Sequence, residues 1–167
     1  KGKNDSVRFA ANEKFITYFE KLLSQSGSFS RTYDSLKNVS VQTASDSSFR
    51  IYTWVVPHFD GQKYNYFGYV QLHSAKSDTL IGLKDSTDVI QKPESEKLNS
   101  DRWLGAVYYD IIPIESSGKK YYTLLGWKGK NRDQTLKIID VLSINKDQLK
   151  FGFPIFKTGS VYRNRIV

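Results

Sequence analysis

The chain has 167 residues and a formal net charge of +8, from 25 Lys and Arg against 17 Asp and Glu residues. This length suits one domain with its own hydrophobic core, and 39% hydrophobic with 14% aromatic residues exclude a disordered chain. Because there is no cysteine, disulfides, thiolate metal sites and cysteine nucleophiles are excluded. No apolar run approaches the roughly 20 residues of a transmembrane helix.

A helix is predicted over residues 6–24, where apolar residues recur at helical spacing. Asp5 or Ser6 is the predicted N-cap, and Gly27 marks the end of the helical region. Because the helix has one apolar stripe, we expect it to cover a sheet; a helix lying on a membrane surface is the alternative. The stripe consists of Phe15, Ile16, Phe19, Leu22 and Leu23.

From residue 39 onward the apolar residues alternate with polar ones, which is typical of β-strands. The short connections between the predicted strands favour antiparallel pairing. The polar segment 85–103, which contains Pro93, predicts a long surface loop. The predicted strands are 39–44, 49–56, 64–73, 79–84, 105–114, 121–128, 136–144 and 149–151.

The chain also contains an internal repeat. Residues 51–57 align with 107–113 at an offset of 56 residues, a glycine turn follows in both copies, and residues 66–69 then align with 124–127. A fixed period near this length is typical of supersecondary units that share a core. We predict two three-stranded units, residues 39–84 and 104–144, and expect residues 149–167 to begin a further unit.

Alternation within the first strand of each unit predicts which face is buried. The expected core face carries Ile51, Thr53 and Val55 in the first copy, and Val107, Tyr109 and Ile111 in the second. The opposite face, expected to be half solvated, carries Arg50, Tyr52 and Trp54, and Ala106, Tyr108 and Asp110.

Three segments carry a resemblance to a known family: 49–54 (FRIYTW), 103–109 (WLGAVYY) and 121–127 (YYTLLGW). With these strand signatures the chain resembles a family of uncharacterised exported proteins of Bacteroidota. The resemblance implies location in the periplasm or at the cell surface, and it supplies no catalytic residues. Members of the family extend beyond the position of Val167. We therefore expect a fragment of a longer protein, whose remainder, or a protein partner, completes the sheet after Val167.

The same resemblance implies a modification. Exported proteins of this lineage are O-glycosylated where Asp is followed by Ser or Thr and then a small or apolar residue. Four positions fit this pattern, and they are Ser6, Ser35, Thr79 and Ser86.

Candidate catalytic residues are few. The chain has two histidines, so a three-histidine zinc site is excluded, and no phosphate-binding loop or dinucleotide fingerprint is present. We therefore predict no metal and no cofactor. His58 precedes Asp60 in a turn, and Asp110 is an acid flanked by apolar residues, so His58 and Asp110 are the candidates for a hydrolase.

Aromatic and basic residues provide candidates for ligand binding. Stacked rings beside cations suit glycans or acidic polymers; single-stranded nucleic acid uses the same ingredients, but export argues against it. The alternative interpretation is that the rings pack within the sheets. The candidate rings are Tyr52, Trp54, Tyr69, Trp103, Tyr108 and Trp127, and the candidate basic patch is Lys119, Lys120, Lys128, Lys130 and Arg132.

The sequence thus predicts a mainly β, antiparallel meander with one N-terminal helix, either barrel-like or sandwich-like. The favoured function is a non-catalytic exported binding or assembly module. The alternative is a hydrolase that acts on a glycan or peptide in the periplasm or at the cell surface. Peripheral membrane association is left open.

Overall fold

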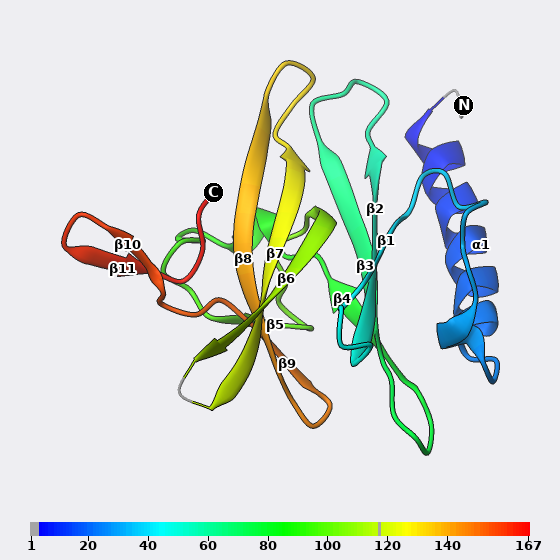
Figure 1. The fold of residues 1–167 in the computed structure, drawn as a ribbon. Helices are drawn as coiled ribbons and strands as arrows, with labels where there is room; N and C mark the ends of the chain where they lie inside the picture. Colours follow the sequence, from blue (N-terminus) through cyan, green and yellow to red (C-terminus); the bar gives the residue numbers. More distant parts are fainter. Residues whose placement is uncertain (1–3, 117) are drawn as a thin grey trace.

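The computed structural model describes residues 4–116 and 118–167. One helix, α1 (Asp5–Leu23), packs on a four-stranded antiparallel sheet, which packs in turn on a five-stranded antiparallel sheet. Figure 1 shows helix, first sheet and second sheet as successive layers. The mainly β prediction is confirmed, with 47% of residues in strands and 15% in helices. The described strands form no closed barrel, which leaves the sandwich-like arrangement.

The first sheet is a meander of consecutive strands, in the order β1 (Ser40–Thr43), β2 (Phe49–Pro57), β3 (Tyr64–Leu72) and β4 (Thr79–Lys84). In the second sheet the order is β5 (Leu98–Asn99), β9 (Gln148–Phe151), β8 (Thr135–Asn145), β7 (Lys119–Gly129) and β6 (Val107–Ser116). The meander β6–β9 of this sheet is joined by the short strand β5, which pairs with β9. A separate hairpin consists of β10 (Phe156–Thr158) and β11 (Val161–Arg163), and short 3-10 helices span Ser28–Ser30 and Thr87–Val89.

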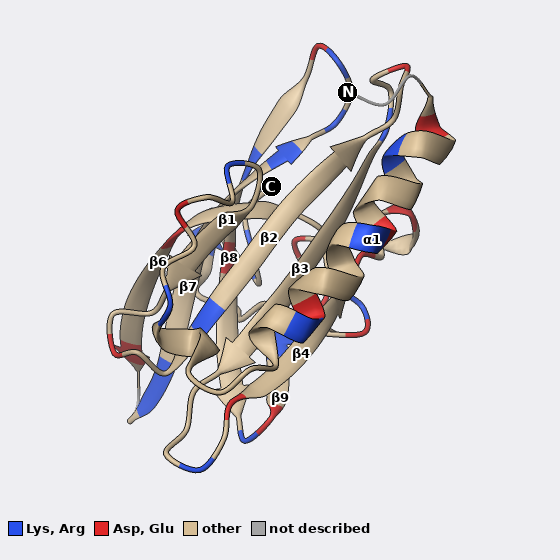
Figure 2. Ribbon diagram, turned by 90° about the vertical axis from the view of Figure 1, so that its right-hand side faces the viewer, with Lys and Arg blue, Asp and Glu red and all other residues tan. Residues whose placement is uncertain are grey.

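Helix α1 covers the first sheet, as the apolar stripe predicts. The N-cap is Asn4 instead of Asp5 or Ser6, because the Asn4 side chain accepts a hydrogen bond from the Val7 amide at 3.0 Å. Figure 2 shows α1 lying in front of the first sheet and running alongside β2, with basic and acidic residues both on the helix. On its inner side, the Phe19 ring meets the Tyr52 ring edge-on, with centroids 5.3 Å apart.

The other face of the first sheet forms the main core together with the second sheet. Phe49, Ile51 and Val70 face this core from β2 and β3, and each is fully buried. Leu124 and Leu142 face it from β7 and β8, also fully buried. Burying an aliphatic or phenyl side chain contributes about 1.5–3 kcal/mol, so this interface holds the two sheets together.

The two predicted units correspond in topology and in pairing. Strands β2–β3–β4 and β6–β7–β8 are both three-stranded antiparallel meanders. Trp54 pairs with Phe67, and the aligned residue Asp110 pairs with Leu125, which aligns with Phe67. The hairpin register is therefore the same in the two copies from these residues to the turn, and it differs by one residue on the other side of them. Residues 149–151 lie in β9 and so add a strand to the second sheet.

The core face predicted for the second copy is wrong at Tyr109, whereas Val107 packs against the main core. The pairing of β6 with β7 shifts register between Tyr108 and Asp110, which is a β-bulge. One extra residue reverses the direction of the side chains that precede it. Ala106 and Tyr108 are consequently buried in the core, whereas Tyr109 is 45% exposed. Beyond the bulge, Ile111 packs against the core as predicted.

A buried ion pair fixes the C-terminal segment. The Arg165 Nε lies 3.1 Å from Asp140 Oδ1 on β8, and both side chains have no exposed surface. Arg165 also donates to the carbonyl oxygens of Pro93 and Glu96, so it joins the loop 85–103 to the second sheet. Next to it, Ile166 exchanges two backbone hydrogen bonds with Ile139 of β8.

Strand β6 forms one edge of the second sheet. It carries the bulge at Tyr108–Asp110 and also Pro113, whose nitrogen has no hydrogen to donate. Both features hinder the pairing of a further strand with an exposed edge.

The helix–sheet contact can be tested with two neighbouring aromatic residues of α1. We expect Phe19→Ala to lower the free energy of unfolding by about 3–5 kcal/mol, because this buried ring contacts the first sheet. Tyr18→Ala is the control, since the Tyr18 ring is 71% exposed and should change stability by less than about 0.5 kcal/mol. Urea unfolding followed by circular dichroism measures both; equal losses would contradict the packing described.

The buried ion pair predicts a non-additive effect. Arg165→Met leaves Asp140 buried without its partner and should cost about 3–5 kcal/mol of unfolding free energy. In Asp140→Leu/Arg165→Met no charge is left behind, so the double variant should recover at least half of this loss. Chemical denaturation measures the free energy of unfolding of the single and double variants. A double variant as unstable as Arg165→Met would refute the prediction.

Candidate functional site

The two candidate catalytic residues are not brought together. His58 follows β2, with its Nδ1 3.2 Å from Asp5 Oδ2 and its Nε2 3.0 Å from Asn65 Oδ1. It thus ties the start of α1 to the β2–β3 hairpin. Asp110 lies on β6 in the other sheet, is exposed, and accepts a hydrogen bond from the Ile111 amide. No contact between His58 and Asp110 exists among the described residues.

Four of the six candidate rings are buried. Tyr52 and Trp54 lie between α1 and the first sheet, whereas Trp103 and Tyr108 lie in the core between the sheets. Their polar atoms are used within the protein: Tyr52 Oη donates to Gln71 Oε1 at 2.8 Å, and Trp103 Nε1 donates to Tyr108 Oη at 3.1 Å. These rings are therefore unavailable for stacking on a ligand.

The remaining two candidate rings are half-buried and lie apart. Tyr69 Oη donates to Glu20 Oε1 of α1 at 2.6 Å, which places this ring beside the helix. Trp127 on β7 meets Tyr64 edge-on in contact with the main core. The predicted aromatic platform is thus not formed, and the alternative interpretation, packing within and between the sheets, describes these side chains.

The candidate basic patch is divided between the two ends of β7. Lys119 and Lys120 begin this 11-residue strand, whereas Lys128 lies near its other end and Lys130 and Arg132 follow it. At about 3.3 Å per residue, the two groups are roughly 30 Å apart. They therefore form two separate features of the surface.

Lys128 is a structural residue. It is only 6% exposed, and its Nζ donates to Thr87 Oγ1 at 2.7 Å and to the Gly105 carbonyl oxygen at 2.6 Å. The ammonium also lies 4.2 Å from the centroid of the Tyr66 ring. Burial lowers the pKa of Lys128 to about 8, although the nearby carboxylates Asp85 and Asp88 oppose this shift.

The four predicted glycosylation positions differ in exposure. Ser6 in the first turn of α1 and Ser35 before β1 are exposed, whereas Thr79 and Ser86 are partly buried. Their modification stays a prediction.

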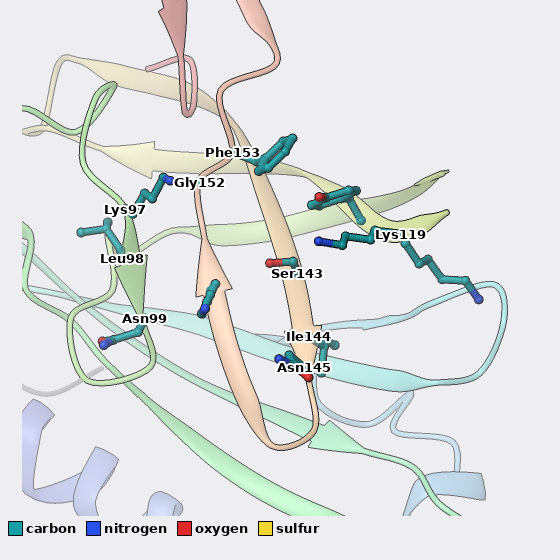
Figure 3. A pocket seen from close by; sticks show the side chains of 12 residues that line it. Lys97, Leu98, Asn99, Lys119, Ser143, Ile144, Asn145, Gly152 and Phe153 are labelled. Carbon is teal, nitrogen blue, oxygen red and sulfur yellow. The ribbon is translucent and has the colours of Figure 1, made fainter. Parts of the chain in front are cut away.

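A hollow of about 720 Å³ lies on the second sheet, on the side away from the main core. We call it the lysine hollow. Its size falls within the range of small-molecule binding sites, and Figure 3 shows the side chains that line it, on or beside β5, β7, β8 and β9. The lining residues are Lys97, Leu98, Asn99, Lys119, Lys120, Tyr121, Ser143, Ile144, Asn145, Lys150, Gly152 and Phe153.

Strand pairing aligns polar side chains across the floor of the lysine hollow. Leu98 and Ile144 pack in the main core, so the residues on either side of each point outward into the hollow. Lys150 on β9 pairs with Ser143 on one side and with Asn99 on the other. These three side chains therefore form one row perpendicular to the strands.

The lysine hollow carries uncompensated positive charge. Within the described part of the chain, Lys97, Lys119 and Lys150 make no ion pair, and none of the residues lining the hollow is acidic. Lys120 differs, because its Nζ lies 2.7 Å from Asp46 Oδ2. A site of this kind attracts anions, since no carboxylate among the described residues forms an ion pair with the ammonium groups of Lys97, Lys119 and Lys150.

Asp46 anchors the rim of the hollow. Its carboxylate belongs to the β1–β2 turn and accepts hydrogen bonds from Lys120, Ser48 and Tyr122, so it links the first sheet to β7 of the second. Burial by itself raises the pKa of Asp46, but these hydrogen bonds outweigh it and hold that pKa well below the usual value. The ion pair with Asp46 thereby holds Lys120 at the edge of the hollow. Among the described lining residues, the positive charge that is not paired belongs to Lys97, Lys119 and Lys150.

Two aromatic rings form part of the wall of the lysine hollow. Tyr121 on β7 and Phe153 lie with their centroids 4.4 Å apart and their planes inclined by 32°. Both side chains are half-buried, so part of each ring faces the solvent. The lysine hollow thus combines ammonium groups, amide and hydroxyl groups, and an aromatic pair.

Comparisons with protein-family models, with curated proteins and with solved structures find no match to this chain. No helix within residues 4–116 and 118–167 is long and apolar enough to cross a membrane. Across the same residues, no group of three or more His, Asp and Glu side chains is placed to hold a metal ion.

The buried amine of Lys128 predicts how stability depends on pH. Its pKa is about 8 in the folded chain, against 10.5 normally, so above pH 8 the unfolded chain holds more protons and the free energy of unfolding rises with pH. Between pH 8 and 9.5 we expect a rise on the order of 1–2 kcal/mol. Lys128→Met should lack this rise, whereas the exposed control Lys130→Met should keep it. Urea titrations across this range measure the effect, and identical pH profiles would contradict it.

Proposed function

We propose that this protein is a non-catalytic binding module that holds an anionic ligand in the lysine hollow. One observation carries the proposal: three lysines without ion-pair partners surround a concave site, and none of its described lining residues is acidic. Such a site concentrates negative charge, and its polar floor supplies hydrogen bonds that orient what is bound.

The resemblance to exported proteins of Bacteroidota supports a location in the periplasm or at the cell surface, and we include that location in the proposal. Assembly with a protein partner is a further part of it. The hydrolase alternative stays a prediction from the sequence, because the described structure separates His58 from Asp110 and none of the described residues lining the lysine hollow is acidic.

Binding to immobilised heparin, a dense polyanion, tests the anion site. We expect Lys119→Ala/Lys150→Ala to elute at lower salt than the wild type, because two ammonium groups of the hollow are removed. The slope of log affinity against log salt should fall by about one for each lysine lost.

The control is Lys76→Ala/Lys157→Ala, which removes the same charge from exposed positions in the β3–β4 turn and on β10. It should elute close to the wild type. Equal elution of the two double variants would show that net charge alone governs retention, and the lysine hollow would then not be the anion site.

A further inference from the structure

We infer that the anionic ligand of the lysine hollow is an acidic oligosaccharide, a chain of sugar rings that carry carboxylates. This inference rests on the proposed function and adds the chemical class of the ligand. Three features of the hollow carry it: the exposed ring surface of the Tyr121–Phe153 pair, the lysines that make no ion pair in the described structure and stand on opposite sides of the hollow, and the amide and hydroxyl side chains of its floor.

The aromatic pair provides a surface for a sugar ring. A pyranose has an apolar face of C–H groups, and such a face packs on an aromatic ring, whereas a carboxylate or phosphate group alone gains nothing there. The Tyr121 and Phe153 rings pack on each other with their centroids 4.4 Å apart, and this contact fixes the orientation of both rings. A simple polyanion would use the lysines of the hollow and leave this wall unused.

The free lysines stand on opposite sides of the hollow. Lys119 stands on β7 and Lys150 on β9, with β8 between them. Strand β8 pairs with β7 only from Tyr122 onward, so Lys119 lies beyond the paired part of these two strands and the hollow opens between the two lysines. A ligand that meets both ammonium groups therefore has to carry more than one carboxylate, as a chain of sugar acids does.

The amide and hydroxyl side chains on the floor of the hollow suit the hydroxyl groups of sugar rings. Asn99, Ser143 and Asn145 line the floor of the hollow, and amide and hydroxyl groups both donate and accept hydrogen bonds. Sugar hydroxyls do the same. A ligand that carries only acceptor oxygens, such as polyphosphate, would satisfy the donors of these side chains and leave their carbonyl acceptors unused.

The test is a calorimetric titration of the protein with three hexamers: α-1,4-linked hexagalacturonate, neutral maltohexaose and hexa-L-glutamate. We expect hexagalacturonate to bind on the order of tenfold more tightly than either of the others, because only it supplies both rings and carboxylates. Tyr121→Ala should weaken hexagalacturonate about fivefold to tenfold and leave hexaglutamate unchanged. Tyr18→Ala, which removes an exposed ring on α1, is the matched control and should change neither.

The outcomes separate this inference from the proposed function. If hexaglutamate binds as tightly as hexagalacturonate and Tyr121→Ala weakens neither, the ligand class is wrong and the anion site stands. If neither anion binds, or maltohexaose equals hexagalacturonate, both proposals fail. Tighter binding of a thymidine oligonucleotide than of hexagalacturonate would assign the hollow to nucleic acid instead. Because the ligand panel is read on the wild type first, a Tyr121→Ala protein that does not fold leaves the comparison of ligands intact.

Discussion

The first sheet is apolar on both faces, and this constraint determines the rest of the architecture. Strand β2 alone places Ile51 toward one side and Tyr52 toward the other, and neither has any exposed surface. A sheet of this kind needs two covers, which are α1 and the second sheet. The second sheet packs on the first by one face, and the lysine hollow lies on its opposite face.

The coarse fold was predictable because it depends on local patterns. Period-two alternation marks the strands, and the repeat predicts that Trp54 and Asp110 hold equivalent places in their hairpins, as they do. The faces of β6 were not predictable, because the bulge at Tyr109 inserts one residue without a glycine or proline to mark it. A single unmarked residue was enough to exchange Tyr108 with Tyr109 between core and solvent.

The candidate site was largely hidden from the sequence for a different reason. Of its free lysines, only Lys119 belongs to a basic run, whereas Lys97 and Lys150 are isolated in the sequence. They come together through the pairing of β9 with both β8 and the two-residue strand β5, which is a non-local contact. Conversely, Lys128 looks like a surface residue in its basic run, but hydrogen bonds to Thr87 and Gly105 hold it in the interior. Charge along the chain was therefore a poor guide to charge on the surface.

The irregular edge strand has a consequence for how the molecule behaves among its own copies. A bulge and Pro113 interrupt β6 along its outer side, so a second copy cannot dock there as a continuous ladder of amide and carbonyl groups. Growth of a fibril by strand pairing, the usual hazard of a long exposed edge strand, is therefore blocked along β6.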